Sequence, residues 1–314
     1  VVLDNLSNGH RQAVPPNVQF YQTDIHDVAR VENILREEAI THVIHFAAYA
    51  YVGESVSEPL KYYKNNISGT VALLEAIRKA GVKYFVFSSS CATYGTPNRL
   101  PLTEDHPQNP INPYGETKLA IEKLLRSMAA QKQISYAALR YFNAAGASQD
   151  GSIGEDHTPE SHLIPLVLQV AMGQRKHVCI FGSDYPTPDG TCIRDYIHVE
   201  DLATAHLKAL NILEKSGESL ELNLGTGRPA SVKEIVDICQ QVTGHRIPVT
   251  IEPRRAGDPA ELTADNTKAM QVLDWKPHYT DLHAIIDSAW QWHRKHPRGY
   301  VNKKPASSSP VAAG

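Results

Sequence analysis

The sequence predicts an α/β fold, in which a doubly wound parallel sheet is joined to a smaller α/β domain. Short apolar runs rich in β-branched residues alternate with stretches whose apolar residues recur at helical spacing. This alternation is typical of parallel strands connected by crossover helices. The chain has 314 residues, which suits two domains of roughly 150 residues each.

The first four predicted elements establish the alternation. Val1–Leu3 has the composition of a strand end, and Val18–Thr23 is the next apolar run of strand length. Val28–Glu38 has helical periodicity, and Thr41–Ala48 follows as a buried strand. A β-β-α-β order at the start of the chain favours a sheet with crossover connections.

The next four elements repeat the pattern more clearly. Asn66–Ala80 has apolar residues at helical spacing and is followed by Gly81, a residue type favoured just after a helix. Lys83–Ser88 is a strand, Tyr114–Ala130 a long helix and Tyr136–Tyr141 another strand. These segments complete the core of the predicted sheet.

The second half of the sequence has a different residue pattern, in which polar loops separate helical segments. Residues 151–161 and 184–190 are polar and contain Gly or Pro, which indicates surface loops. Helical periodicity returns at Val199–Leu213, Ser231–Thr243 and Asp281–Lys295. We expect these helices to belong mainly to the smaller domain.

The predicted domain boundary lies near residue 144. Residues 1–144 form the first domain and 145–302 the second, with segments near 190–225 returning to the first sheet. The tail, 303–314, is rich in Pro, Ser and Ala and is expected to be disordered.

Composition excludes several classes of protein. A net charge of −3 does not indicate the excess of positive charge that is typical of nucleic-acid-binding proteins. No apolar run approaches the ~20 residues that span a membrane, and the first residues lack the basic start of a signal peptide. The four cysteines form no C-x-x-C pair, which predicts reduced thiols in a cytoplasmic protein and no metal site.

The strand ends of the first domain suggest a Rossmann-type dinucleotide site. There, an acidic residue ~20 residues after a Gly-rich turn binds the adenosine ribose, and Asp4 suits that position. Its charge would repel a 2′-phosphate and so favours NAD over NADP. Asn5 and Asp24 stand at the same end, while Phe46 and Ala47 follow a later strand. Because no G-x-x-G-x-x-G occurs in the chain, the predicted sheet is N-terminally truncated, without its first strand and Gly-rich loop.

A Tyr-x-x-x-Lys motif opens the long helix of the first domain. The i,i+4 spacing puts Tyr114 and Lys118 on one helix face. A free tyrosine has a pKa of about 10, and a neighbouring ammonium favours the phenolate and lowers that pKa. Ser90 ends the preceding strand at the ligand edge of the sheet, where it could share a proton with Tyr114. The three residues therefore predict proton abstraction from a hydroxyl group.

These motifs together resemble the UDP-glucose 4-epimerases of the extended short-chain dehydrogenase/reductase family. The resemblance extends from residue 1 to about residue 300. The matching stretches are Val2–Gly9, His45–Ala47, Val52–Ser55, Tyr62–Thr70, Phe87–Gly95, Pro113–Lys118, Arg140–Asn143, Ile180–Gly182, Asp189–Thr191, Arg194–Val199, Asn223–Gly225 and Arg254–Asp258.

The resemblance implies a role for each candidate site residue. Tyr114 is the base, Lys118 its electrostatic partner and Ser90 a proton-sharing partner. The implied NAD ligands are Asp4, Asn5, Asp24, Ile25, Phe46, Ala47, Asn65, Lys118 and Tyr141. The implied UDP-sugar ligands are Asn143, Leu163, Phe181, Arg194, Tyr196, Arg255 and Asp258. Paired arginines suit a diphosphate, and a carboxylate suits ribose hydroxyls.

The implied activity belongs to galactose metabolism. It interconverts UDP-galactose and UDP-glucose through a transient 4-keto sugar and bound NADH, in a cytoplasmic homodimer. Ala50 stands where some members have lysine. Leu262 stands where glucose-only enzymes often have tyrosine, which leaves 4-epimerisation of UDP-GlcNAc/UDP-GalNAc open. The stretches Tyr51–Ser55 and Ser90–Gly95 also resemble pentose 4-epimerases, so UDP-arabinose/UDP-xylose stays open. A nucleotide-sugar dehydratase is disfavoured because Cys91 and Ala92 replace its acid/base pair. An inactive fragment is the remaining alternative.

Overall fold

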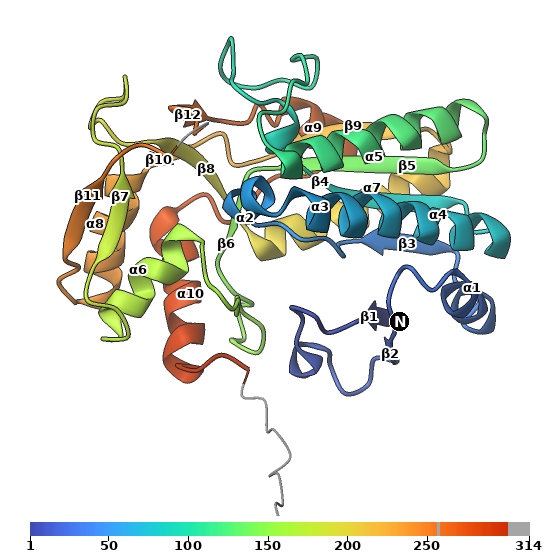
Figure 1. Cartoon of the computed structure of the whole chain (residues 1–314), viewed down its shortest axis with the longest axis horizontal. Helices are drawn as coiled ribbons and strands as arrows, with labels where there is room; N and C mark the ends of the chain where they lie inside the picture. The colour runs from blue at the N-terminus through green and yellow to red at the C-terminus, as the bar shows by residue number, and fades with distance from the viewer. Residues whose placement is uncertain (256–257, 301–314) are drawn as a thin grey trace, which may run out of the picture.

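A four-stranded parallel sheet forms the centre of the molecule (Figure 1). The structure, a computed structural model, describes residues 1–255 and 258–300. The strand order is β3-β4-β5-β9 and every pairing is parallel. These strands are β3 (His42–His45), β4 (Tyr84–Ser90), β5 (Ser135–Tyr141) and β9 (Leu220–Leu224).

Helices cover both faces of this sheet. Neighbouring residues of a strand point to opposite faces, so apolar residues in succession pack against helices on both sides. On β4, Phe85 and Phe87 join the hydrophobic cluster of α4 (Gly69–Ala80) and α5 (Pro113–Ala130). Val86, between them, joins the cluster of α7 (Val199–Ser216) on the other face. The predicted doubly wound parallel sheet is therefore confirmed.

The first two strands stand apart from the central sheet. β1 (Val2–Asp4) and β2 (Phe20–Gln22) form a separate parallel pair, which Figure 1 places beside β3. All three residues of β1 are partly exposed. Helix α1 (Val28–Glu37) packs against α4 and links this pair to the rest of the fold.

The second half of the chain builds a smaller α/β body. Its first sheet has the order β10-β8-β12, with β6 also pairing with β8, and its second sheet pairs β7 with β11. The strands are β6 (Asn143–Ala145), β7 (Val178–Phe181), β8 (Ile193–His198), β10 (Pro229–Ser231), β11 (Val249–Glu252) and β12 (Glu261–Leu262). The remaining described helices of both halves are α2 (Val52–Ser57), α3 (Pro59–Tyr62), α6 (Leu163–Ala171), α8 (Val232–Thr243), α9 (Thr267–Leu273) and α10 (Leu282–Lys295), with short 3₁₀ turns at Arg11–Ala13 and Cys91–Thr93.

Several predicted boundaries shift in the structure. The strand predicted to end at Ala48 ends at His45, and the helix predicted to begin at Asn66 has a π-helical turn over Tyr63–Ser68 before α4. Gly81 closes α4 as expected, with a left-handed φ of 81°. No helix of the described part is both long and apolar enough to cross a membrane. The tail predicted to be disordered, 303–314, lies outside the described residues.

Candidate active site

The start of α5 carries the reacting tyrosine to the carboxyl end of β4. The Asn112 side chain caps the helix by accepting a hydrogen bond from the Gly115 amide at 2.9 Å, and Pro113 occupies the first turn. A Cβ atom on Gly115 would stand 2.5 Å from the carbonyl oxygen of Ala92. Only glycine therefore lets the helix approach the loop after β4 so closely. This approach sets Tyr114 beside the end of β4.

Tyr114, Lys118 and Ser90 are all buried and form one group. The Lys118 ammonium lies 5.6 Å from the centre of the Tyr114 ring. It donates a hydrogen bond of 2.7 Å to the Ser88 carbonyl oxygen, which anchors it to β4. Tyr141 stands opposite Ser90 in the register of β5, and its hydroxyl lies 2.5 Å from Ser88 Oγ. The structure thus brings the predicted reacting residues together at the carboxyl edge of the sheet.

Burial dominates the electrostatics of this group. It raises the pKa of Tyr114, and so does Tyr141, while the Ser90 hydroxyl opposes the rise. Burial also lowers the pKa of Lys118 to about 8, although the charge of Glu122 opposes that change. The sequence predicted a lowered pKa for Tyr114, whereas in the chain alone the pKa of Tyr114 is raised. A cationic nicotinamide beside Tyr114 would add a positive charge that favours the phenolate.

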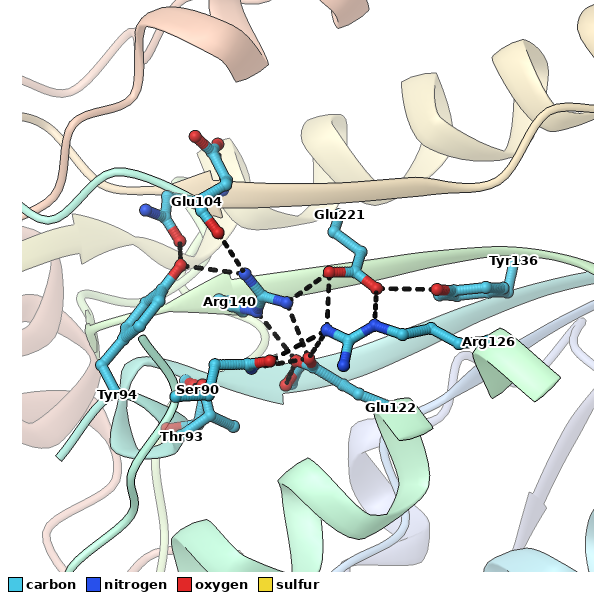
Figure 2. Close-up of polar contacts among 12 residues, drawn as sticks. Ser90, Thr93, Tyr94, Glu104, Glu122, Arg126, Tyr136, Arg140 and Glu221 are labelled. Carbon is cyan, nitrogen blue, oxygen red and sulfur yellow. Dashed lines mark hydrogen bonds and ion pairs between the residues drawn. The ribbon is translucent and has the colours of Figure 1, made fainter. Parts of the chain in front are cut away.

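A largely buried ionic network joins α5, β5 and β9 close to the end of β4 (Figure 2). Arg140 donates to Glu122 at 2.7 and 2.9 Å and to Glu221 at 2.6 Å, and Ser89 donates to Glu122 at 2.6 Å. Arg126 joins Glu221 at the exposed end. Sequence reasoning missed this network, although Glu122 extends the i,i+4 series that begins at Tyr114 and Lys118. That spacing could have identified Glu122 as the residue beneath Lys118.

The predicted adenosine-binding residues meet at the ends of β1 and β2. Asn5 donates a hydrogen bond to Asp24 at 2.8 Å, and Asp4 accepts one from the Leu6 amide at 2.6 Å. The backbone amide of His26 lowers the pKa of Asp24 to about 2, with further help from Asn5. Asp24 is therefore ionised at neutral pH, and two carboxylates face this corner. This donor set suits the hydroxyl groups of an adenosine ribose.

Phe46 and Ala47 follow β3 at the same edge of the sheet. Both are exposed, and 57% of Phe46 is accessible to solvent. The Phe46 ring centre lies 4.8 Å from that of His206. Asn65, from the π-helical turn, donates to Asn66 at 3.0 Å. An exposed aromatic ring and a small residue at a strand end leave room for a flat ring to stack, so the residues present fit an NAD molecule.

The predicted diphosphate-binding residues form a second charged group. Arg194 donates to Asp258 at 2.5 Å, and the Arg255 guanidinium lies 3.9 Å from the centre of the Phe181 ring. Burial raises the pKa of the Cys91 thiol to about 12, and the charge of Arg194 opposes that rise. Arg194 therefore lies within electrostatic reach of the loop that follows Ser90.

Three further predicted residues line the connection between the two halves. Asn143 lies on β6 opposite Tyr196 of β8, and this pairing begins two residues after β5 ends. Leu163 opens α6. Leu262 stands opposite Arg194 in the register of β12 and packs on the cluster that contains Cys91. Leu262 therefore lies near the residue that follows Ser90, and Asn143 follows the strand that carries Tyr141, whereas the adenosine group is built on different strands.

The chain is similar to proteins of known activity along nearly its whole length. The model of the NAD dependent epimerase/dehydratase family matches residues 1–225. A UDP-glucose 4-epimerase from Halalkalibacterium halodurans is 54% identical over 300 residues, covering 96% of this chain and 90% of that protein.

Two solved structures extend this similarity to the fold. A crystal structure of a UDP-glucose 4-epimerase superposes with a TM-score of 0.93 at 52% identity, covering 95% of this chain and 91% of that one. An enzyme from Stenotrophomonas maltophila, solved with NAD and formylated UDP-arabinopyranose, has a TM-score of 0.91 at 43% identity, with coverage of 94% and 90%.

Proposed function

The chain belongs to the NAD dependent epimerase/dehydratase family, and from that premise we propose that it interconverts UDP-glucose and UDP-galactose at C4. The observation that carries the proposal is the buried group of Tyr114, Lys118 and Ser90 at the carboxyl edge of the sheet. NAD, the cofactor of the family, supplies a hydride acceptor that returns the hydride in the same catalytic cycle.

In this proposal the chain handles the proton. Tyr114 removes it from the C4 hydroxyl group as general base, and Ser90 shares it through its hydroxyl. Lys118 stabilises the phenolate with its ammonium charge. The positive charge of the oxidised cofactor adds to this effect and offsets the pKa rise that burial imposes on Tyr114.

The sugar must present either face to the same base while the nucleotide stays bound. Arg194 and Arg255 supply two positive charges for the diphosphate. Asp258, which pairs with Arg194 here, is an acceptor for the uridine ribose hydroxyls. Holding the UDP part and leaving the sugar free to turn accounts for the inversion.

The test replaces Tyr114 by Phe, which removes the phenol and leaves the ring. We expect the turnover rate, measured as UDP-glucose formed from UDP-galactose, to fall ~10²–10⁴-fold. UDP binding by calorimetry should not change. Tyr279→Phe is the control, because Tyr279 hydrogen-bonds Glu200 and lies outside the reacting group. Near-normal turnover in Tyr114→Phe would refute the base.

The proposed sugar range depends on Leu262. Leucine leaves more space than tyrosine beside Arg194, so UDP-N-acetylgalactosamine and UDP-arabinose should be assayed alongside UDP-galactose. We expect Leu262→Tyr to lower the rate with the N-acetylated sugar more than the rate with UDP-galactose. Equal effects on both would remove Leu262 from the sugar pocket.

Dehydration is disfavoured at this site. It requires an additional acid/base pair after the strand-end serine, where this chain has Cys91 and Ala92. The Cys91 thiol is buried and its pKa is raised to about 12, so it does not exchange protons readily at neutral pH.

We further propose that the chain acts as a cytoplasmic homodimer. Exposed apolar side chains recur at helical spacing along α2, α3 and the turn that follows, at Val52, Val56, Leu60 and Tyr63. A second copy covering this face would remove it from water. Four free cysteines agree with a reducing compartment. Light scattering of the wild-type chain and of Leu60→Glu tests the dimer, and an unchanged mass in the variant would exclude this face.

A further inference from the structure

The loop between β6 and α6 gathers two glutamates and two histidines. Glu155, His157, Glu160 and His162 each offer one ligand atom, and these four atoms all lie within 4.8 Å of one another. The cysteine spacing predicts no metal site, but histidines and carboxylates can bind a metal without cysteine. An E-x-H-x-x-E-x-H pattern can supply a different donor set from eight consecutive residues.

The four side chains converge on one point and do not form two separate pairs. Glu155 Oε1 lies 3.2 Å from His157 Nδ1 and 2.7 Å from His162 Nδ1. Glu160 also contacts both imidazoles, at 3.8 Å from His157 Nδ1 and 3.0 Å from His162 Nδ1. Ligand atoms at ~2.0–2.2 Å from a tetrahedral zinc ion stand roughly 3.3–3.6 Å apart. The four separations, from 2.7 to 3.8 Å, lie on both sides of this range, so each would change by less than 1 Å when such an ion binds.

We propose that Glu155, His157, Glu160 and His162 bind one divalent transition-metal ion, with zinc as the preferred metal. Two imidazoles with two carboxylates suit zinc, whereas Mg²⁺ and Ca²⁺ favour all-oxygen sites. Two carboxylates and two neutral imidazoles carry a formal charge of −2, which a divalent ion cancels. The proposal concerns metal binding alone and is independent of the epimerase reaction.

The surroundings hold the ligands in place before metal binding. The backbone amides of Ser161 and His162 donate to Glu160 Oε1 at 2.7 and 2.8 Å, which fixes that carboxylate. Tyr51 lies against both imidazoles, with ring centres 5.6 Å from His157 and 6.2 Å from His162. Outer contacts of this kind orient metal ligands and raise affinity.

The site has a structural consequence at the junction of the two halves. His162 is the residue before α6, and Leu163 begins that helix. Tyr51 precedes α2 in the first half of the chain. A metal bound by the loop would hold the start of α6 against this segment and limit the movement of Leu163.

Metal content is the direct test. The full chain is stripped with a chelator, supplied with zinc, desalted and analysed by plasma mass spectrometry. We expect about one zinc per chain, and less than a tenth of that in His157→Gln/His162→Gln. The control is His245→Gln/His283→Gln, which changes two exposed histidines outside the cluster and should retain zinc fully.

A measurement on the unaltered chain covers the case in which the double variant does not fold. Zinc X-ray absorption of wild type should show four N/O ligands at ~2.0–2.2 Å, including imidazole. Failure of wild type to retain zinc would overturn the proposal and leave the cluster as paired carboxylates and imidazoles. Equal zinc retention by a folded His157→Gln/His162→Gln variant would overturn it as well.

Discussion

The reacting corner (Ser90, Tyr114 and Lys118) on the central sheet and the adenosine corner (Asp4 and Asp24) on the separate pair β1 and β2 are built in opposite ways. Ser90, Tyr114 and Lys118 are buried on one seven-residue strand and an 18-residue helix, next to the ion pair of Glu122 with Arg140, which is itself buried. Asp4 and Asp24 lie at the ends of two three-residue strands that pair only with each other among the described strands.

The difference indicates where each kind of precision is needed. In the proposed mechanism, proton transfer requires fixed distances and a controlled dielectric, which the buried end of β4 and the buried face of α5 provide. Ribose recognition requires accessible acceptors, which exposed strand ends supply. The reacting corner should therefore be costly to perturb, and the adenosine corner should tolerate substitution with losses confined to binding.

The largest effect is expected from Glu122→Gln, which breaks the ionic network. Both Glu122 and Arg140 have side chains that are at most 1% exposed, so the arginine would lose its best-buried counter-charge. We expect unfolding free energy to fall by about 3–5 kcal/mol, measured by urea denaturation. Glu116→Gln, an exposed change on the same helix, should leave it nearly unchanged. A small loss in Glu122→Gln would mean that Glu221 alone compensates Arg140.

A smaller effect, on rate, is expected from Lys118→Met. Removing the ammonium takes away the positive charge that lies 5.6 Å from the centre of the Tyr114 ring, so turnover should fall about 10²-fold, or about 2.7 kcal/mol. Burying that ammonium costs free energy, as its lowered pKa shows. Unfolding free energy should therefore not fall with the rate. Lys123→Met, exposed on the same helix, is the control for turnover.

Sequence patterns predicted the residues of the reacting corner better than the ionic network that lies next to them. The Tyr114–Lys118 spacing and the serines of β4 are local features, and the fold class followed from element order. Glu122, Arg140 and Glu221 come from three different elements, and Glu221 follows Arg140 by 81 residues. Their meeting depends on strand order, which periodicity does not reveal. None of the strands β6 to β12 was predicted individually, and of these β6, β10 and β12 have only two or three residues, which carry no alternation.

The acid sensitivity of the network is expected to depend on Glu221. Burial raises its pKa, but hydrogen bonds from Arg126 and Tyr136 and the charge of Arg140 outweigh burial and bring it to about 2, from an ordinary value of 4.5. The unfolded chain therefore binds a proton below pH 4.5 that the folded chain still excludes, so this stabilisation is lost as pH falls from 4.5 towards 2.

Glu221→Gln isolates that contribution. The variant should be less stable than wild type by about 1–3 kcal/mol at pH 7, and the difference should shrink between pH 4.5 and pH 3. Urea denaturation at four pH values measures it. Glu218→Gln provides the matched control, because Glu218 is exposed and lies two residues before Leu220, where β9 begins. A difference that stays constant down to pH 3 would show that the glutamate charge is not what stabilises the network.

The smallest change in stability is expected at the adenosine corner, from Asp4→Asn. Asn can still accept the Leu6 amide, so unfolding free energy should stay within about 0.5 kcal/mol of wild type. A neutral amide is a weaker acceptor than a carboxylate, so NAD affinity by calorimetry should fall about tenfold, or 1.4 kcal/mol.

NADP affinity should fall less in the same variant, because the repulsion between Asp4 and a 2′-phosphate is removed. Asp27→Asn is the control, since Asp27 caps α1 nearby and asparagine caps helices equally well. If Asp4→Asn bound NAD normally, the adenosine ribose would lie elsewhere and the contrast between the two corners would lose its functional meaning. If it instead unfolded, the exposed pair of strands would be as tightly coupled to the core as β4 is.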